Sequence, residues 1–525
     1  MNDRQYGNKS RRRFLTGLGA GLVATSCPVL SREHAPAFIT SDRMRPVIPY
    51  GVATGDTTAG KALIWSKCDR SARMVVQYGR RPNPLTMHTI LGPVVGPETD
   101  FTAKLVLEGL PPGSDIFYRV RFQDPESGIP SLPEDGQFRA AGGRQRNIRF
   151  QWSGDICGQG YGINPDLGGM TIFRTMELRD PDFFICCGGH IYADGLMEAE
   201  QLLPDGTLWR NVLIPEKTRV AETLDDFRGN YRYNLLDGSL RSFNARVAQI
   251  NQWDDHEVHN NWYPGEILTD PRYGENQVDV LARNARQAFF DYLPINSSPH
   301  TPQRIYRRLR QGPLLDIFVL DMRSYRGPNG TNDQALAGKD TALLGETQLK
   351  WLMAELSASK ALWKVVTSDM PLGLVVGKVG AYEAVANGNG PVQGREHEIA
   401  RLLKFIKDQS INNLVFLTAD VHYTAAHHYH PDRAQFQDFN PFWEFVSGPL
   451  NAGTFGPSLL DDTFGPEVVY QRHPPDGLSN LPPSAGFQFF GEAAIDAIDG
   501  FMTVTLLDMW GTSLFEQRIE PMSEL

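Results

Sequence analysis

Residues 247–257 have the sequence Val-Ala-Gln-Ile-Asn-Gln-Trp-Asp-Asp-His-Glu. An apolar run passes directly into a cluster of charged side chains, which is typical of a buried strand that ends at a ligand site. From residue 148 onward, five further apolar runs lead into Asp, His or Arg in the same way, at residues 149–152, 183–187, 314–320, 363–367 and 414–418. Because the runs alternate with helical stretches, we predict an α/β domain over residues 148–522, with a site at the carboxyl ends of its strands.

Residues 45–140 predict a separate all-β domain in front of this one. Alternating runs at residues 62–66, 74–78, 102–108 and 116–122 are separated by turns that contain Gly, Pro and Asp. The turn Gly-Leu-Pro-Pro-Gly at residues 109–113 leads into a strand, as in fibronectin-like β-sandwiches. At the other end, runs at residues 501–507 and 514–519 predict a final hairpin on the α/β sheet.

The composition describes a globular chain of about two or three domains, since its 525 residues exceed one ordinary core. No apolar run reaches the roughly 18 residues of a membrane span. The cysteines show neither metal-finger spacing nor a disulfide framework. Cys186 and Cys187 lie within an apolar run and are expected to be buried strand residues.

Residues 1–37 are interpreted as a twin-arginine signal peptide. Ser-Arg-Arg-Arg-Phe-Leu at residues 10–15 precedes a Gly- and Ala-rich apolar stretch, which predicts passage through the twin-arginine export machinery to the periplasm, the cell surface or the medium. A basic tail is one alternative, and lipid anchoring at Cys27 is another that Ala24 disfavours. Without residues 1–37 the chain has 45 basic and 59 acidic residues, a net charge of −14, so no general affinity for nucleic acid or anionic membranes is expected.

Metal-ligating side chains follow the predicted strands. Hydrolysis of a phosphoester requires neutralisation of the phosphoryl oxygens and a hydroxide at neutral pH, and two metals about 3.5–4 Å apart supply both. Such a pair needs about half a dozen Asp, His, Asn or Tyr ligands. Residues of these types follow all six of the apolar runs.

The motifs around these residues extend over most of the chain. They are Trp-Ser-Gly-Asp at 152–155, Gly-Gly-His-Ile-Tyr-Ala-Asp-Gly at 188–195, Trp-Asp-Asp-His-Glu at 253–257 and Thr-Ala-Asp-Val-His at 418–422. Leu-Asp-Met-Arg-Ser-Tyr-Arg at 320–326 and Tyr-Gly-Val-Ala-Thr-Gly-Asp at 50–56 extend the set. In type and order they resemble the PhoD-type alkaline phosphatase/phosphodiesterase family of the metallophosphoesterase superfamily, from about residue 48 to 522.

The resemblance implies a four-layer metallophosphoesterase sandwich that follows the β-sandwich and holds a dinuclear centre of Fe³⁺ and Ca²⁺ or another divalent metal. Asp155, Tyr192 as a phenolate and His422 would bind the first metal. Asp255 and Asp420 would bind the second. The implied activity is that of an exported hydrolase of phosphomonoesters, phosphodiesters or both, a phosphoric ester hydrolase similar to alkaline phosphatase D.

Two further residues receive catalytic roles from the resemblance. His256 would donate to the substrate or leaving-group oxygen without binding metal. Arg323, which matches a family arginine loosely, would contact phosphate, and an ion pair is its equal alternative. Every candidate also has a structural alternative: a turn for Asp155, packing for Tyr192 and a core histidine for His256.

Neighbouring polar residues leave further possibilities open. Asp254 is expected to be structural, because Asp255 is the residue that aligns. Asn260 and Asn261 are expected to cap a loop rather than bind metal. The histidines at 427, 428 and 430 are expected in a solvated loop, and Cys157 is a minor candidate for a soft iron ligand.

Gly189 departs from the family pattern, which has at this position an aspartate that bridges both metals. Water or hydroxide then bridges unaided, the metals bind weakly, or catalysis is lost. The alternatives to an active hydrolase are a non-catalytic relative that binds phosphorylated ligands and an envelope interaction module built on the sandwich. Gly189→Asp is expected to restore metal binding if φ of residue 189 is negative, and to fail if it is positive. His190 is expected to point elsewhere.

Overall fold

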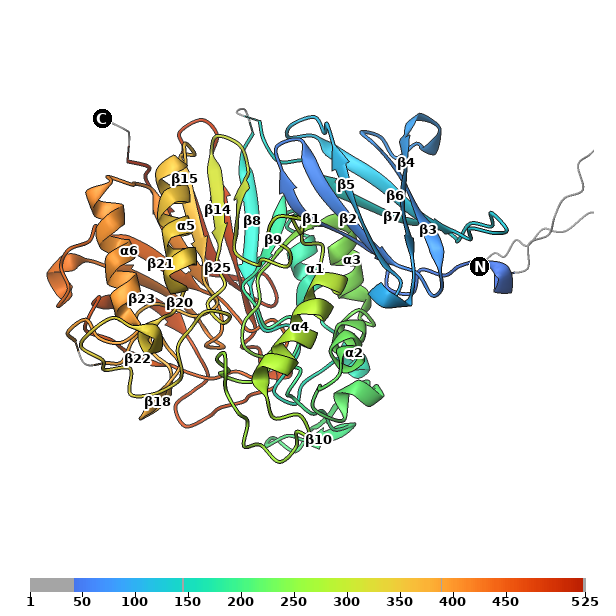
Figure 1. The fold of residues 1–525 in the computed structure, drawn as a ribbon. Helices are drawn as coiled ribbons and strands as arrows, with labels where there is room; N and C mark the ends of the chain where they lie inside the picture. Colours follow the sequence, from blue (N-terminus) through green and yellow to red (C-terminus); the bar gives the residue numbers. More distant parts are fainter. Residues whose placement is uncertain (1–41, 144–145, 389, 523–525) are drawn as a thin grey trace, which may run out of the picture. The chain divides into compact units, whose positions relative to one another are not determined.

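Two large sheets lie face to face in the structure, a computed structural model that describes residues 42–143, 146–388 and 390–522 (Figure 1). The expected signal peptide, residues 1–37, lies outside the described residues. In spatial order the nine-stranded sheet contains β26 (Ser513–Ile519), β25 (Met502–Asp508), β24 (Phe489–Ile495), β8 (Ile148–Ser153), β9 (Phe183–Cys186), β12 (Ala248–Asn251), β1 (Val52–Thr58), β2 (Lys61–Lys67) and β5 (Thr102–Glu108). The seven-stranded sheet contains β13 (Arg307–Arg310), β14 (Leu315–Val319), β15 (Trp363–Thr367), β19 (Leu414–Thr418), β21 (Phe442–Val446), β20 (Thr424–Tyr429) and β23 (Pro466–Arg472).

All six apolar runs singled out in the sequence form strands, and they divide equally between the two sheets. β8, β9 and β12 are parallel neighbours in one sheet, and β14, β15 and β19 are parallel neighbours in the other. The expected final hairpin, β25 with β26, extends the nine-stranded sheet through β24. Parallel neighbours end at the same edge, so the loops that follow these six strands are gathered there.

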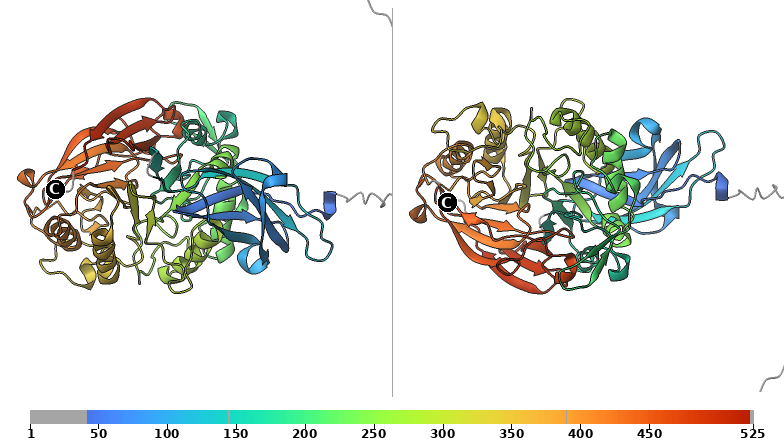
Figure 2. Two further views of the ribbon diagram at one scale, coloured as in Figure 1. Left: turned by 90° about the horizontal axis from the view of Figure 1, so that it is seen from above. Right: turned by 90° about the horizontal axis from the view of Figure 1, so that it is seen from below.

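Helices cover the outer face of each sheet (Figures 1 and 2). Within residues 42–522, apart from the gaps named above, the α-helices are α1 (Ile172–Glu177), α2 (Leu224–Asn234), α3 (Gly238–Arg246), α4 (Val278–Tyr292), α5 (Gly345–Ala358) and α6 (Glu396–Asp408). Along β9, Phe183 and Ile185 pack into the core between the sheets, whereas Phe184 packs with Phe173 of α1 and Phe243 of α3. On β14, Phe318 likewise faces α5. A strand buried on both faces requires apolar residues at consecutive positions, which explains the unbroken apolar runs and confirms the four-layer sandwich.

The predicted N-terminal β-sandwich is present. A four-stranded sheet of β4 (His88–Val95), β3 (Ala72–Gly79), β6 (Asp115–Gln123) and β7 (Glu134–Arg139) packs against β1, β2 and β5. The sequence did not predict how this domain is joined to the next. β1 pairs in parallel with β12 at Gly55 and Gln249, so one sheet of the sandwich continues into the nine-stranded sheet.

Short two-stranded sheets are also present in the described part of the chain, apart from the large ones. They are β10 (Glu200–Leu202) with β11 (Leu208–Arg210), β16 (Leu374–Val375) with β22 (Leu459–Leu460), and β17 (Gly377–Lys378) with β18 (Ala381–Tyr382). None of the helices among the described residues is both long and apolar enough to span a bilayer.

The prediction that the histidines at 427, 428 and 430 lie in a solvated loop is wrong for His427 and His428. His427 and His428 belong to β20, which pairs on both sides, with β21 and β23. His427 is fully buried, and its Nδ1 lies 3.0 Å from Glu444 Oε2. The sequence analysis did not predict this strand, because its antiparallel pairing with β21 and β23 depends on distant segments and not on a local pattern. Cys186 and Cys187 are buried as expected.

Candidate metal centre and active-site cleft

Three expected ligands of the first metal meet beyond the ends of β8, β9 and β19. The Tyr192 hydroxyl donates to Asp155 Oδ1 at 2.8 Å and lies 2.8 Å from His422 Nε2. His422 Nε2 is in turn 3.4 Å from Asp155 Oδ1. All three side chains are buried. The structure therefore brings together residues that are up to 267 positions apart in the chain.

The backbone at these strand ends is held in an uncommon conformation. Asp155, Asp420 and His422 have φ values of 61°, 66° and 60°, in the left-handed region. Non-glycine residues there cost about 1–3 kcal/mol each, and such strain persists where surrounding contacts impose it, most often at functional sites. Two backbone hydrogen bonds hold Asp155. Its N–H donates to the Gly188 carbonyl (3.1 Å), and the Asp155 carbonyl accepts from the Leu450 N–H (3.1 Å).

A second group of ligand atoms contains three carboxylates. One oxygen from each of Asp254, Asp255 and Asp420 can be chosen so that all lie within 4.8 Å of one another. Asp255 and Asp420 are the two ligands that the sequence assigned to the second metal. Asp254, which the sequence analysis treated as structural, joins them.

Arg323 lies inside the protein, with no exposed side-chain surface. Its guanidinium pairs with four carboxylates: Asp254 (2.7 Å), Asp369 (2.6 Å), Glu383 (2.8 Å) and, more distantly, Asp420 (3.5 Å). The geometry therefore favours the ion-pair alternative over the phosphate contact, because the donors of Arg323 are directed at protein carboxylates.

Asp369 and Glu383 are participants that the sequence analysis left without a role. Asp369 lies two residues after the end of β15, so its place beyond a strand end was a usable signal. Glu383 follows the short strand β18, and nothing in its sequence surroundings points to the site.

His256 is held at the centre of the site by two neighbours. Its Nδ1 lies 2.8 Å from Asp194 Oδ1, and its ring stacks on Tyr192 with a centroid distance of 4.0 Å. The other oxygen of Asp194 accepts the Asn260 backbone N–H at 2.9 Å. Burial lowers the pKa of His256, but the carboxylates of Asp194 and Asp255 outweigh it and raise that pKa to about 10. Asp194, for which the sequence motif gave no role, thus orients the imidazole of His256. In this orientation His256 Nε2 lies 4.0 Å from Asp255 Oδ1.

The residues of both groups fit bound cations. Asp155 Oδ2 and Asp255 Oδ1 are buried without a hydrogen-bond partner among the described residues, which is costly for an acceptor unless a cation approaches it. Burial, together with neighbouring carboxylates, raises the pKa of Asp254 and Asp420 well above the ordinary range. Burial and Asp155 likewise raise the pKa of Tyr192, so a phenolate there would need a cation to stabilise it. These donor types are those of iron and of hard divalent ions.

Gly189 lies between the two groups of ligands. Its φ is +63°, and a Cβ built on it would meet Asp155 Oδ1 at 2.6 Å and the Asp155 backbone nitrogen at 2.8 Å. The preceding Gly188 is equally close to Asp254, since its Cβ would meet Asp254 Cβ at 2.3 Å. Glu257 fixes this arrangement by accepting backbone N–H groups from His190 (2.6 Å) and Asp254 (2.9 Å). The positive φ of Gly189 is the conformation in which Gly189→Asp is expected to fail.

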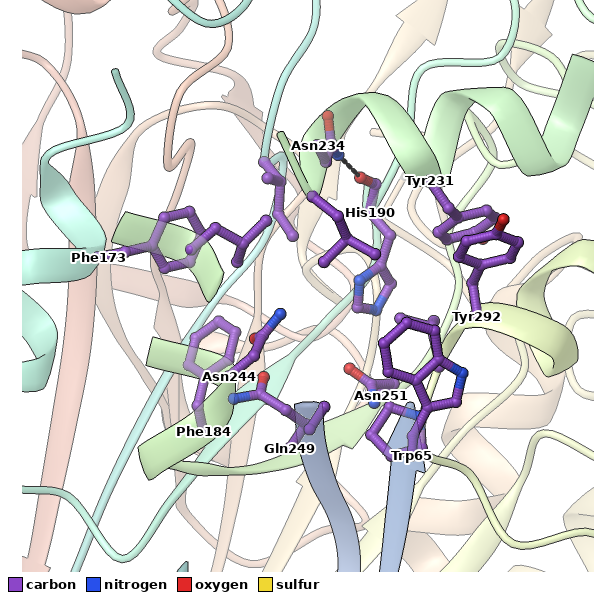
Figure 3. Close-up of a pocket in the computed structure, with 16 residues that line it drawn as sticks. Trp65, Phe173, Phe184, His190, Tyr231, Asn234, Asn244, Gln249, Asn251 and Tyr292 are labelled. Carbon is purple, nitrogen blue, oxygen red and sulfur yellow. Dashed lines mark hydrogen bonds between the residues drawn. The ribbon is translucent and has the colours of Figure 1, made fainter. Parts of the chain in front are cut away.

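His190 points away from the ligands, as expected. Figure 3 shows its ring directed into an internal cavity of about 50 Å³, with Trp65 and Asn251 on the wall. Its backbone carbonyl accepts from the Asn234 amide at 2.6 Å. Burial lowers the pKa of His190 to about 3, so the ring is neutral.

Two minor candidates receive other contacts. The Cys157 thiol points to the Tyr161 carbonyl (3.5 Å), and burial raises the pKa of the thiol to about 12. Cys157 does not belong to the cluster of Asp254, Asp255 and Asp420 among the described residues. Asn261 contacts Asp255 Oδ2 through its backbone N–H (2.6 Å).

An open cleft of about 500 Å³ gives access to the site. Its walls include Asp255, Asp420 and His422, together with His256. A neighbouring groove of about 730 Å³ shares Gln159, His256 and Asn260 with the cleft. His256 therefore stands where the two depressions meet.

Comparison with known proteins gives a consistent result. Residues 150–506 match the family model described as "PhoD-like phosphatase", and residues 33–141 match "PhoD-like phosphatase, N-terminal domain". The chain is 26% identical over 497 residues to alkaline phosphatase D of Bacillus subtilis (strain 168), covering 86% of this chain and 78% of that protein.

Two solved structures share the fold. One, titled "Structure of PhoD", has a TM-score of 0.66 at 18% identity and covers 91% of this chain and 93% of its own. The other, a purple acid phosphatase from yellow lupin (Lupinus luteus) seeds, has a TM-score of 0.54 at 11% identity and covers 91% of this chain and 74% of its own. The phosphoric ester hydrolase expected from the sequence is thereby confirmed, and the chain belongs to the PhoD-like phosphatase family.

Proposed function

We propose that this chain is an exported, metal-dependent hydrolase of phosphomonoesters, phosphodiesters or both. The observation that carries the proposal is the pair of buried ligand groups beside one cleft, which Asp255, Asp420 and His422 line. Each group has a carboxylate oxygen without a hydrogen-bond partner among the described residues. Asp155, Tyr192 and His422 would hold one cation, for which we propose Fe³⁺. Asp254, Asp255 and Asp420 would hold the other, Ca²⁺ or another divalent ion. Two cations supply charge neutralisation at the phosphoryl oxygens and a hydroxide at neutral pH.

The protein side chains around the ligands divide the remaining work. His256 faces the cleft and is oriented by Asp194, so it is placed to hold a proton at the leaving-group oxygen. Arg323 offsets part of the charge of the buried carboxylates and holds Asp254 and Asp420 in position. Without Arg323 the acidic residues would repel one another in a poorly solvated interior.

Metal content tests the proposal, with Asp254→Asn and a matched control. Asp369→Asn also removes a buried carboxylate paired with Arg323 but lies outside the ligand group. We expect wild type and Asp369→Asn to retain two metals per chain after dialysis and Asp254→Asn to lose the second. We also expect wild type to hydrolyse p-nitrophenyl phosphate or its bis ester. Absence of bound metal in wild type would favour the non-catalytic reading.

Export is a separate part of the proposal and rests on the Ser-Arg-Arg-Arg-Phe-Leu pattern at residues 10–15. Replacing Arg11 and Arg12 by Lys keeps the charge but removes the recognised pair. We expect the precursor to accumulate inside cells, as measured by fractionation and immunoblotting. Unchanged export would remove the twin-arginine assignment.

A further inference from the structure

Burial of Arg323 leaves open which cation of the protein contacts the substrate. Asp255, Asp420 and Glu383 line the cleft, where His256 is already paired with Asp194, so carboxylates predominate on its walls apart from bound metals. A phosphoester carries negative charge and requires compensating charge or donors where it binds. Among the described residues that line this cleft, Lys378 is the only lysine or arginine.

Lys378 stands on a hairpin that is tied to the acidic cluster. It belongs to β17 and pairs with Ala381 of β18, so Val379 and Gly380 form the tip. At the base, the Tyr382 N–H donates to the Gly330 carbonyl at 2.8 Å. The next residue, Glu383, is the partner of Arg323. These contacts fix the base of the hairpin relative to the candidate metal ligands.

The Lys378 side chain is exposed, and its ammonium group makes no hydrogen bond or ion pair with the described residues. Arg272, which lines the neighbouring groove, provides the contrast because its guanidinium is held by Asp270 at 2.6 Å. Lys378 therefore brings an uncompensated positive charge to the cleft.

We propose that Lys378 binds an anionic oxygen of the phosphoester substrate and sets substrate affinity rather than turnover. The inference rests on the proposed hydrolase function and adds the residue that recognises substrate charge. Because Coulomb energy scales with the product of the charges, Lys378 favours dianionic monoesters, and the inorganic phosphate they release, over monoanionic diesters.

The test compares Lys378→Gln and Lys378→Arg with Lys360→Gln in the metal-loaded protein. Lys360 is also exposed, but it precedes β15 and so lies at the edge where the parallel strands begin, opposite the site. For Lys378→Gln we expect KM for p-nitrophenyl phosphate to rise about fivefold, the upper range for an exposed charge pair. We expect kcat to stay within about twofold, a smaller effect on the bis ester, and recovery of KM in Lys378→Arg.

Inorganic phosphate binding, measured by calorimetry, provides a readout that needs no turnover. We expect Lys378→Gln to weaken it about fivefold and Lys360→Gln to leave it unchanged. An inactive wild type whose phosphate binding depends on Lys378 would remove the proposed function and retain only the assignment of Lys378 as a phosphate-binding residue. An active wild type with identical KM and phosphate affinity in Lys378→Gln would overturn the inference alone.

Discussion

Gly189→Ala and Gly189→Asp are expected to destabilise the protein and weaken its metal site, although the resemblance of the motif implies an aspartate at this position. A left-handed φ costs an L-residue about 1–2 kcal/mol. The new Cβ would also lie 2.8 and 2.9 Å from the backbone N and Cα of Asp155, which must then move. Overpacking of this kind costs a further 1–3 kcal/mol or so, giving a total of about 2–5 kcal/mol. In Gly189→Asp, the added carboxylate also starts beside Asp155 Oδ1.

Gly206→Ala is the matched control, because Gly206 has a φ of +83° and no atom within 4 Å of a built Cβ. It isolates the conformational cost, so the difference between the two alanine variants measures the contact with Asp155. Urea unfolding supplies the free energies, and metal content per chain reports the displacement of Asp155. Equal destabilisation of both alanine variants would refute the steric argument. Stable Gly189→Asp with more bound metal than wild type would show that the site accepts the family's bridging carboxylate after all.

Three further predictions concern the side chains around the ligands. Arg323→Gln leaves buried carboxylates without their countercharge, so we expect the free energy of unfolding to fall by about 3–5 kcal/mol. A fall of less than about 1 kcal/mol would contradict the role of Arg323 as the common partner of these carboxylates. Asp194→Asn is expected to lower kcat about tenfold or more, because His256 loses the carboxylate that orients it. The loss is expected to be larger for esters with poor leaving groups. An equal loss for good and poor leaving groups would show that His256 does not protonate the leaving group. If Tyr192 is a phenolate on ferric iron, the purified protein absorbs visible light and Tyr192→Phe abolishes the band, whereas a band that persists would leave Tyr192 as a hydrogen-bonding residue only.

Local sequence was sufficient where a residue's role depends on its own strand. The buried strands were predictable because both faces are covered and apolar residues predominate at consecutive positions, as in 363–367 and 414–418. The positions of Asp155 and Asp420 followed, since parallel strands deliver their carboxyl ends to one edge. The convergence of Tyr192 and His422 was expected from the motifs, and the structure shows their contact.

Roles that depend on several distant segments were decided only by the tertiary structure. Arg323 meets carboxylates from residues 254, 369, 383 and 420, and no local pattern distinguishes such a buried partner from a free phosphate contact. The left-handed backbone of Gly189 is set by its approach to Asp155, 34 positions earlier in the chain. The strand pairing that continues the sandwich into the nine-stranded sheet joins Gly55 to Gln249, 194 positions later in the chain. The periodicity of the sequence indicates whether a side chain is buried, because burial requires apolar residues at regular positions. Which residue it packs against depends on the packing of segments that are distant in the chain.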